Sequence, residues 1–256
     1  MMNLFSFFKK TQNVSFNTPF HVDIHSHLLP QIDDGVQSLK ESIEIIKRFK
    51  LLGYTKLITT PHIISDFYPN NQEIINKKLL TVQEQLKLEN IDIVLEAGAE
   101  YYVDMSFLCL IEEQKELVTF MGHYVLFETS CTDKPIILEL VISSLLKKGY
   151  IPVLAHPERY QYLHHNLELY KMLKAQGVLF QVNAKSLYDK SKSSYKIAIK
   201  LINSGLVDFI GSDAHRMRDM NKLEVFLRSN TCKKMIKLNK IRNNHQRKEI
   251  DAIYPN

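Results

Sequence analysis

Histidine, aspartate and glutamate residues recur along this chain at the ends of short apolar runs. The chain has seven such runs, and only the sixth, which ends at Asn183, lacks a residue of these types. The polar residues at the other run ends are His25 and His27, His62, Glu100, Glu128, His156, and Asp213 with His215. Imidazole and carboxylate groups are ordinary ligands of divalent metal ions. These residues therefore predict a metal centre, provided that the fold brings the run ends together.

Two pairs of these residues have the spacing that one shared ion needs. His25 and His27 are two residues apart, and side chains at that separation on a strand point to the same face. Asp213 and His215 repeat the spacing, and the Asp-Asp-Gly turn after the first pair offers a carboxylate that can fold back over the run ends. A single histidine at a strand end is more often structural than a ligand, but burying so many ionisable groups together is costly without an ion. Mixed nitrogen and oxygen ligands suit Mn, Fe, Zn or Co better than Ca or Mg.

The seven apolar runs are predicted to be parallel strands. They are almost continuously apolar, as expected for strands that are buried on both faces, and they span residues 22–27, 56–62, 91–100, 124–129, 151–158, 179–184 and 207–215. The stretches between them are typical of amphipathic helices, and the clearest cover residues 39–49, 136–148, 167–175 and 195–203, each followed by a glycine that ends the helix. This alternation predicts an α/β fold with parallel strands. In a β/α barrel the carboxyl ends of all strands meet on one face, and active sites lie there.

Length and composition predict a single domain over residues 1–256, with an N-terminal extension at 1–20 and a basic tail or helix at 231–256. The formal net charge is +5, a mild excess that fits an anionic substrate without requiring one. Three cysteines, far apart and odd in number, argue against a disulfide framework and predict a reducing compartment. No apolar stretch approaches the ~20 residues of a membrane-spanning helix, so we expect a cytoplasmic protein.

The first ten residues, MMNLFSFFKK, leave an alternative open. Their apolar part is too short for a signal peptide, and the lysines follow it instead of preceding it. We expect a frayed terminus, and a peripheral contact with a membrane surface is the alternative. The basic tail lacks interleaved aromatic residues and no motif that reads nucleic acid is present, so we expect no nucleic-acid binding.

Several motifs resemble those of one known superfamily. The segment DIHSHLLPQIDDG (23–35) resembles the opening of the polymerase-and-histidinol-phosphatase (PHP) superfamily. Together with TTPHI (59–63), EAGAEYY (96–102), LFET (126–129), LAHPERY (154–160) and GSDAH (211–215), it is similar to the manganese-dependent protein-tyrosine phosphatases encoded with bacterial capsule and exopolysaccharide genes. The resemblance covers roughly residues 20–220. It implies a distorted seven-stranded (β/α) barrel of the PHP type and a centre of two or three divalent ions, with manganese expected and Fe, Zn, Co or Mg as alternatives.

The resemblance also implies a role for each matching residue. The first ion would be held by His25, His27, Glu100 and Asp213, the second by Glu100, Glu128 and His156, and the third by Asp34, His62 and His215. His62 and Arg159 are the residues expected to act in catalysis. Arg159 would bind the substrate phosphate, because its planar guanidinium suits phosphate oxygens. A second phosphate-binding arginine is expected after His215, and the sequence leaves Arg216 and Arg218 as alternatives.

The activity that the resemblance implies is hydrolysis of phosphotyrosine by a metal-activated water, on a tyrosine kinase that regulates capsule or exopolysaccharide synthesis. Cysteine-phosphatase chemistry is excluded, because it needs C-x5-R and the residues six positions after the three cysteines are Lys115, Ile137 and Leu238. Two alternatives stay open: another PHP reaction, on a small phosphomonoester such as histidinol phosphate or on a nucleic acid, and a non-catalytic regulatory role. The complete set of nine ligand residues favours an enzyme, and the sequence makes no prediction of the oligomeric state.

Overall fold

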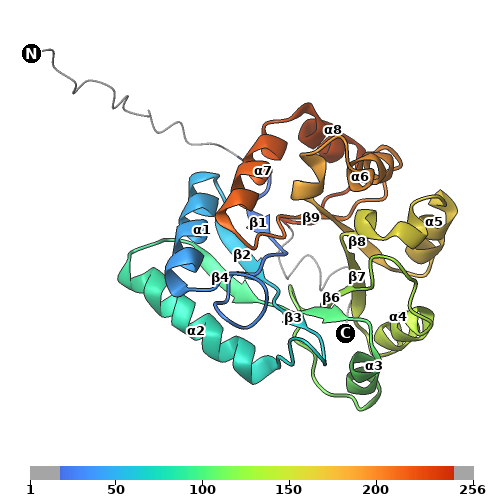
Figure 1. Cartoon of the computed structure of the whole chain (residues 1–256), viewed down its shortest axis with the longest axis horizontal. Helices are drawn as coiled ribbons and strands as arrows, with labels where there is room; N and C mark the ends of the chain where they lie inside the picture. Colours follow the sequence, from blue (N-terminus) through green and yellow to red (C-terminus); the bar gives the residue numbers. More distant parts are fainter. Residues whose placement is uncertain (1–17, 245–256) are drawn as a thin grey trace, which may run out of the picture.

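Parallel strands and helices alternate along residues 18–244, the part of the chain that the computed structural model describes (Figure 1). Its strands form two sheets, one ordered β1-β2-β4 and the other ordered β3-β5-β6-β7-β8-β9, and all neighbouring strands are parallel. The strands are β1 (Val22–Asp23), β2 (Lys56–Thr59), β3 (His62–Ile63), β4 (Val94–Ala97), β5 (Glu100–Tyr102), β6 (Tyr124–Glu128), β7 (Ile151–Ala155), β8 (Leu179–Asn183) and β9 (Phe209–Gly211). Each of the seven predicted runs contains at least one strand, so the predicted parallel α/β fold is confirmed.

Two of the predicted strands are interrupted near their carboxyl ends, and the interruptions divide the sheet. Thr60 and Pro61 separate β2 from β3, and Gly98 and Ala99 separate β4 from β5. Proline lacks the N–H that a ladder bond needs, which accounts for the first break. At the second, the backbone runs so close to Phe120 that a Cβ at Gly98 would lie 3.2 Å from the Phe120 Cβ. The expected distorted seven-stranded (β/α) barrel is therefore not confirmed, because the strands of residues 18–244 form two separate sheets.

Backbone contacts continue the parallel pairing past the breaks. Beside the breaks, the Gly98 N–H donates to the carbonyl of Thr59 at 2.9 Å and the Glu100 N–H donates to the carbonyl of Pro61 at 3.0 Å. At the other side, Ser26 lies just beyond β1 and forms an isolated parallel bridge with Ala214, which lies beyond β9. The carboxyl ends of strands from both sheets therefore face one common region.

Eight α-helices of the described chain surround the strands (Figure 1). The four helices that the sequence singled out are present as α1 (Leu39–Leu51), α4 (Leu138–Lys147), α5 (Leu167–Ala175) and α6 (Ser193–Asn203). The other four are α2 (Gln72–Leu88), α3 (Met105–Glu112), α7 (Met217–Leu227) and α8 (Asn230–Leu238). The side chains of Ser38, Asn71 and Asp104 accept hydrogen bonds from the first turns of α1, α2 and α3, where the helix itself leaves N–H groups unpaired.

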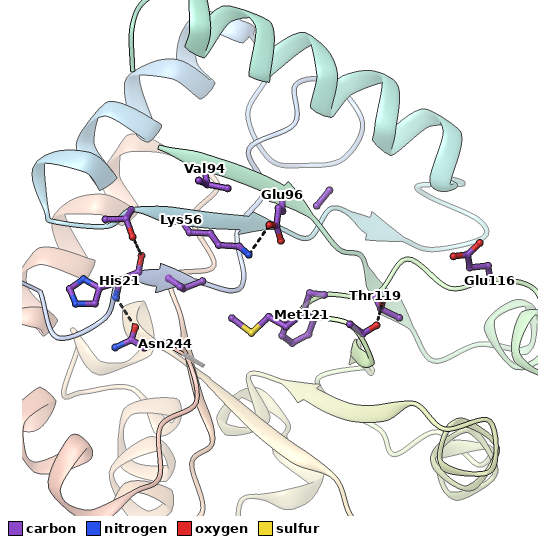
Figure 2. Close-up of a pocket in the computed structure, with 13 residues that line it drawn as sticks. His21, Lys56, Val94, Glu96, Glu116, Thr119, Met121 and Asn244 are labelled. Carbon is purple, nitrogen blue, oxygen red and sulfur yellow. Dashed lines mark hydrogen bonds and ion pairs between the residues drawn. The ribbon is translucent and has the colours of Figure 1, made fainter. Parts of the chain in front are cut away.

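Burial differs between the two sheets. β6, β7 and β8 are buried along almost their whole length, as predicted for strands that are covered on both faces. The same prediction is wrong for β4, where Val94 is 53% exposed and Glu96 is exposed as well. Both line a cavity of about 940 Å³ near the amino ends of the strands, and Figure 2 shows them beside Lys56, which pairs with Glu96 at 2.7 Å. The cavity is open because β4 is an edge strand of its sheet.

The predicted basic tail is partly folded onto the domain. It begins as α8, and buried asparagines after this helix bind the segment that leads into β9. Asn239 Oδ1 accepts the Val207 N–H at 3.0 Å, and Asn243 Oδ1 accepts the Ile210 N–H at 2.9 Å. The remainder of the tail from residue 245, and the MMNLFSFFKK segment, lie outside the described residues. Between residues 18 and 244 no helix is both long enough and apolar enough to cross a membrane.

Candidate metal centre

All nine predicted ligand residues lie in one cluster at the carboxyl ends of the strands. His62 and Glu100 begin β3 and β5, Glu128 ends β6, and the others follow the ends of β1, β7 and β9. Every one of the nine has an imidazole nitrogen to carboxylate oxygen distance of 3.4 Å or less to another member. Residues from both sheets therefore contribute to a single site.

Glu100 is the centre of the cluster. Its Oε2 lies 3.2 Å from His25 Nε2, 3.4 Å from His27 Nε2 and 3.2 Å from His62 Nδ1. Its Oε1 lies 3.0 Å from His156 Nε2. Burial alone would raise the pKa of this fully buried carboxyl, but His25 and His62 outweigh burial and hold the pKa well below its usual range. Glu100 is therefore an ionised bridge between four imidazoles.

Two other carboxylates extend the cluster in opposite directions. On one side, Glu128 Oε1 lies 3.0 Å from His62 Nδ1. On the other, Asp213 Oδ1 lies 3.2 Å from His215 Nδ1 and 3.6 Å from His27 Nε2. Asp213 is almost fully buried, and Lys185 and His25 overcome the effect of burial to keep its pKa well below the usual value.

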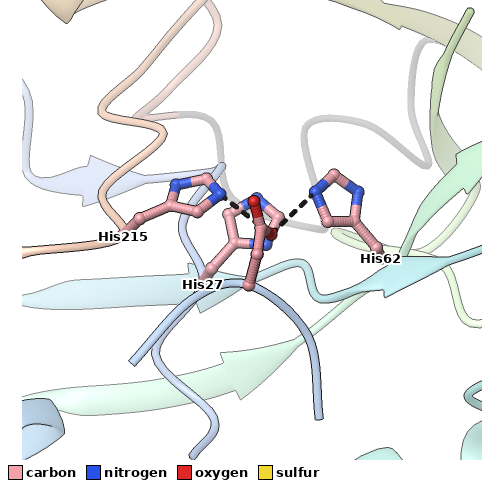
Figure 3. Close-up of side chains that lie close together, drawn as sticks. His27, His62 and His215 are labelled. Carbon is pink, nitrogen blue, oxygen red and sulfur yellow. Dashed lines mark ion pairs between the residues drawn. The ribbon is translucent and has the colours of Figure 1, made fainter. Parts of the chain in front are cut away.

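Asp34 closes the cluster from the solvent side. Its Oδ1 lies 3.4 Å from Nε2 of both His62 and His215, and its side chain is 54% exposed. Figure 3 shows His27 between His62 and His215. The residues form four overlapping groups, and within each group the possible ligand atoms lie within 4.8 Å of one another. The groups are His27 with Asp34, His62 and His215; His25 with His27 and Glu100; His25 with His156 and Asp213; and His62 with Glu100 and Glu128. His62 thus lies between the solvent-side group and the Glu100–Glu128 group.

Two of these residues leave their strands with an unusual backbone. His156 and Asp213 have φ values of 34° and 49°, in the left-handed region that non-glycine residues rarely adopt. Each follows the end of a strand, β7 or β9, and the left-handed turn directs its side chain into the cluster. Such local strain is typical of functional sites, where the surrounding structure holds it in place.

Hydrogen bonds fix the orientation of the first two histidines. His27 Nδ1 lies 2.7 Å from Asp33 Oδ2, and His25 Nδ1 lies 2.7 Å from Gln181 Oε1. Both partners accept hydrogen bonds, so each Nδ1 is held as the donor and each Nε2 is the atom that can bind a metal ion. These two Nε2 atoms are only 3.3 Å apart and both face Glu100. Imidazole nitrogens and carboxylate oxygens that converge in this way suit a divalent cation, so the residues present fit a metal ion.

Strand β8 supplies orienting amides in place of a ligand. Gln181 Nε2 donates to Asn183 Oδ1 at 2.8 Å, and Asn183 Nδ2 donates to Asp213 Oδ2 at 2.5 Å. A chain of hydrogen bonds therefore runs from His25 through both amides to Asp213. The sequence analysis missed this role, although two polar residues at alternate positions of a buried strand were the available signal. It also missed Lys185, whose Nζ lies 2.8 Å from Asp213 Oδ2.

Without a metal ion, the negative charge of the carboxylates is offset by protons bound to histidines. Burial lowers the pKa of His62, but Glu100 and Asp34 outweigh burial and raise the pKa to about 12. Burial is likewise outweighed at His215, where Asp213 and Asp34 raise the pKa to about 10. Protonated histidines therefore offset the carboxylates. A metal ion that binds the same atoms must displace these protons, so metal binding and proton release are coupled.

A cleft of about 840 Å³ lies over the cluster, and all three predicted phosphate-binding arginines line it. Arg159 Nη1 lies 3.4 Å from His156 Nε2 and 3.8 Å from Asp213 Oδ2, at the edge of the cluster. The Arg216 guanidinium is turned toward the backbone, where it donates to the carbonyl of Gly35. Arg218, in the first turn of α7, is exposed to the cleft.

Comparisons with known proteins show the family to which the chain belongs. The chain matches the family described as capsular polysaccharide synthesis, CpsB/CapC, over residues 21–246. It is 32% identical to the CapC protein of Staphylococcus aureus over 195 residues, which are 76% of each chain. It is 30% identical to the tyrosine-protein phosphatase CpsB of Streptococcus pneumoniae over 203 residues, which are 77% of this chain and 83% of CpsB.

A solved structure gives a similar result. It comes from a study of YwqE from Bacillus subtilis and CpsB from Streptococcus pneumoniae, described as unique metal-dependent tyrosine phosphatases. The TM-score is 0.73 at 25% sequence identity, and the superposition covers 88% of this chain and 96% of the other.

Proposed function

Because the chain belongs to the CpsB/CapC family of capsular polysaccharide synthesis, we propose that it is a metal-dependent protein-tyrosine phosphatase. The observation that carries this proposal is the convergence of five imidazoles and four carboxylates beneath a cleft that Arg159 lines. The relatives CpsB and YwqE are named as tyrosine-protein phosphatases, and this supports the same substrate class for the chain.

We propose that the nine clustered residues hold two or three divalent ions, with manganese as the metal. Glu100 is proposed to be shared between ions, since both of its oxygens face imidazole nitrogens. His62 is proposed as both a ligand and a catalytic residue, because it lies between two of the candidate groups. We further propose that the two sheets are parts of one distorted PHP-type barrel, and the bridge between Ser26 and Ala214 supports this.

The chain's own residues provide binding and orientation for phosphate hydrolysis. When bound, divalent ions supply an acidified water as the nucleophile and neutralise charge on the phosphoryl oxygens. Arg159 is placed to bind the phosphoryl group with its planar guanidinium and to stabilise the charge that develops during transfer. No side-chain nucleophile is needed, and none of Cys109, Cys131 and Cys232 lines the cleft.

We propose Arg218, in preference to Arg216, as the second phosphate-binding arginine. Arg216 already donates to the carbonyls of Gly35 and His215, so using it for phosphate would break these bonds. Arg218 is exposed on the same cleft. The comparison of Arg218→Ala with Arg216→Ala tests this: the first is expected to raise KM for a phosphotyrosine peptide about tenfold. A larger KM increase from Arg216→Ala would reverse the assignment.

The family description supports a proposal for the physiological setting. We propose that the substrate is a phosphorylated tyrosine kinase that regulates capsule or exopolysaccharide synthesis, and that the protein acts in the cytoplasm as a single-domain enzyme. The family description, capsular polysaccharide synthesis, supports this setting.

The activity is tested with purified protein and a phosphotyrosine peptide, with added manganese and with a chelator. Parallel reactions use a phosphoserine peptide and histidinol phosphate, and the matched variants are His62→Ala and Arg159→Ala. Metal-dependent turnover of phosphotyrosine that both variants lose supports the proposal. Turnover of histidinol phosphate alone would keep the metal centre and replace the substrate class.

A further inference from the structure

The cleft over the metal centre has an uneven distribution of charge. Its lining includes six basic side chains: Arg159, Lys185, Lys192, Arg216, Arg218 and Lys222. Apart from the proposed ligand carboxylates, Asp219 is the only acidic residue of the described chain that lines it. Two of the basic residues lie in short 3-10 helices, η1 (Pro157–Arg159) and η3 (Ala184–Leu187). Lys192 and Arg216 directly precede α6 and α7, and Arg218 and Lys222 lie in α7. One side of the cleft therefore carries a surplus of positive charge.

Three of the six basic side chains are engaged by the centre itself. Lys185 Nζ lies 2.8 Å from Asp213 Oδ2, and Arg159 Nη1 lies 3.8 Å from the same oxygen. The Arg216 guanidinium donates to the carbonyl of Gly35, which follows Asp34 in the loop over the cluster. Their positions are thus explained by the architecture of the metal centre.

The other three basic residues lie at the rim of the cleft. Lys192 is exposed and directly precedes α6. Arg218 and Lys222 are four residues apart on α7, so they share one face of the helix. Lys222 Nζ lies 3.1 Å from Asp219 Oδ1, but the other oxygen of this aspartate already accepts backbone N–H groups at the start of α7. The rim therefore has a net positive charge, since the single carboxylate of Asp219 is opposed by the three cationic side chains of Lys192, Arg218 and Lys222.

Two uncharged residues that follow His62, Ile64 and Tyr68, also line the cleft, and the Tyr68 ring stacks on His62 with 5.7 Å between the ring centroids. These residues follow β3, which lies across the ring of helices from α6 and α7 (Figure 1). A phosphotyrosine ring suits an aromatic side chain such as Tyr68. The basic residues of the rim line the same cleft, within which residues next to a bound phosphotyrosine would lie.

We infer that the substrate of this site is a phosphotyrosine segment with acidic side chains beside the phosphotyrosine, and that Lys192 and Lys222 select it. The inference rests on the proposed phosphatase function and adds a substrate class to it. Complementary charges at an interface speed association and disfavour partners of the wrong charge. A neutral segment still reaches Arg159 and the metal centre, but it leaves the two lysines without partners from the substrate.

The test uses two phosphotyrosine peptides of equal length that differ only in about four flanking residues, Asp and Glu in one and Asn and Gln in the other. For the full chain with manganese, kcat/KM for the acidic peptide is expected to exceed that for the neutral peptide by roughly 5- to 20-fold. In the double variant Lys192→Ser/Lys222→Ser the preference is expected to fall to about twofold, with the neutral peptide turned over as before. Raising the salt concentration is expected to lower the preference of the unmodified protein.

The matched control is Lys147→Ser/Lys148→Ser, which removes the same charge from exposed positions at the end of α4 that do not line the cleft. This control is expected to keep the preference for the acidic peptide. Equal turnover of the two peptides by the unmodified protein would overturn the inference alone, as would an equal loss of preference in both double variants. Turnover of neither peptide would overturn the phosphatase function and the inference with it.

Discussion

The two ends of the strands each open into a hollow of similar size, but their chemistry differs. The cavity at the amino ends, about 940 Å³, is lined by a mixture of apolar and polar residues, and its Lys56–Glu96 pair is partly exposed (Figure 2). The cleft at the carboxyl ends, about 840 Å³, has all four candidate metal groups of the described chain beneath it. The volume of the hollow therefore does not distinguish the candidate functional site here. The distinguishing feature is a set of ionisable side chains that converge with fixed orientations.

The origin of this difference is the way in which the chain leaves each strand. At the carboxyl ends, left-handed turns at His156 and Asp213 direct side chains into one volume, and buried partners such as Gln181 orient them. At the amino ends, Val94 and Glu96 point into open space beside an edge strand. Five substitutions that act at one end or the other, together with the pH dependence of stability, put this contrast to the test.

The largest effect is expected from Glu100→Gln. Its carboxylate faces four imidazoles, so removing its charge is expected to lower kcat/KM for a phosphotyrosine peptide by about a thousandfold or more and to reduce the bound metal. The matched control is Glu96→Gln in the amino-end cavity, which is expected to keep activity within about twofold. Comparable activity of the two variants would break the contrast between the ends.

A smaller effect is expected from Asn183→Ala, which cuts the hydrogen-bond chain between Gln181 and Asp213. Removing a partner that orients a metal ligand typically weakens metal binding about 10- to 100-fold, and titration calorimetry with manganese measures this. Asn243→Ala removes a buried amide at the amino end, so it is expected to lower the melting temperature without changing metal affinity. An unchanged affinity in Asn183→Ala would mean that the amides serve packing alone.

The pH dependence of stability is expected to separate metal-free from metal-loaded protein. The pKa values of His62 and His215, about 12 and about 10, lie above the 6.5 of an unfolded histidine. Their stabilisation of the metal-free fold is fully present below pH 6.5 and is lost progressively as pH rises through the folded values. Thermal melts are therefore expected to show a metal-free protein that weakens from pH 6.5 to at least pH 10, and a stabilisation by manganese that grows over the same window. A metal-induced shift that is larger at low pH would contradict this charge balance.

The smallest effect is expected from Lys56→Ala, which removes the ion pair with Glu96 at the amino end. A partly exposed pair of this kind contributes about 1 kcal/mol or less to the free energy of unfolding, and activity is expected to stay unchanged. Urea unfolding and a phosphotyrosine assay of the same preparation measure both quantities. A large loss of activity would show that the two ends are coupled.

The sequence predicted the architecture well where the signal is local. Every apolar run contains a strand, and the four helices that were singled out are present, because periodicity and helix-ending glycines are properties of neighbouring residues. The division into two sheets was not predicted, since it depends on how Pro61 and Gly98 fit against distant strands. The exposure of Val94 was not predicted either. An apolar residue in a strand does not indicate whether that strand lies at the edge of its sheet, as β4 does.

For the site, the sequence predicted which residues would meet, and the structure places all nine together. The orienting partners were missed, because the interactions that Gln181 makes with His25 join residues 156 positions apart. The sequence also could not decide which of Arg216 and Arg218 binds phosphate, for the same reason. Arg216 donates a hydrogen bond to the carbonyl of Gly35, 181 positions away in the chain, and no local sequence pattern predicts such a contact. The ligand roles of the nine residues stay predictions that metal analysis has to test.

The most direct test of the central claim is a metal titration of the purified chain after chelation, followed by both elemental analysis and phosphotyrosine hydrolysis. The account predicts about two to three manganese ions per chain and recovery of activity in step with their binding. In Glu100→Gln both the metal and the activity are expected to stay low. Full phosphotyrosine hydrolysis by metal-free protein, or tight stoichiometric metal binding without any hydrolysis, would contradict the account.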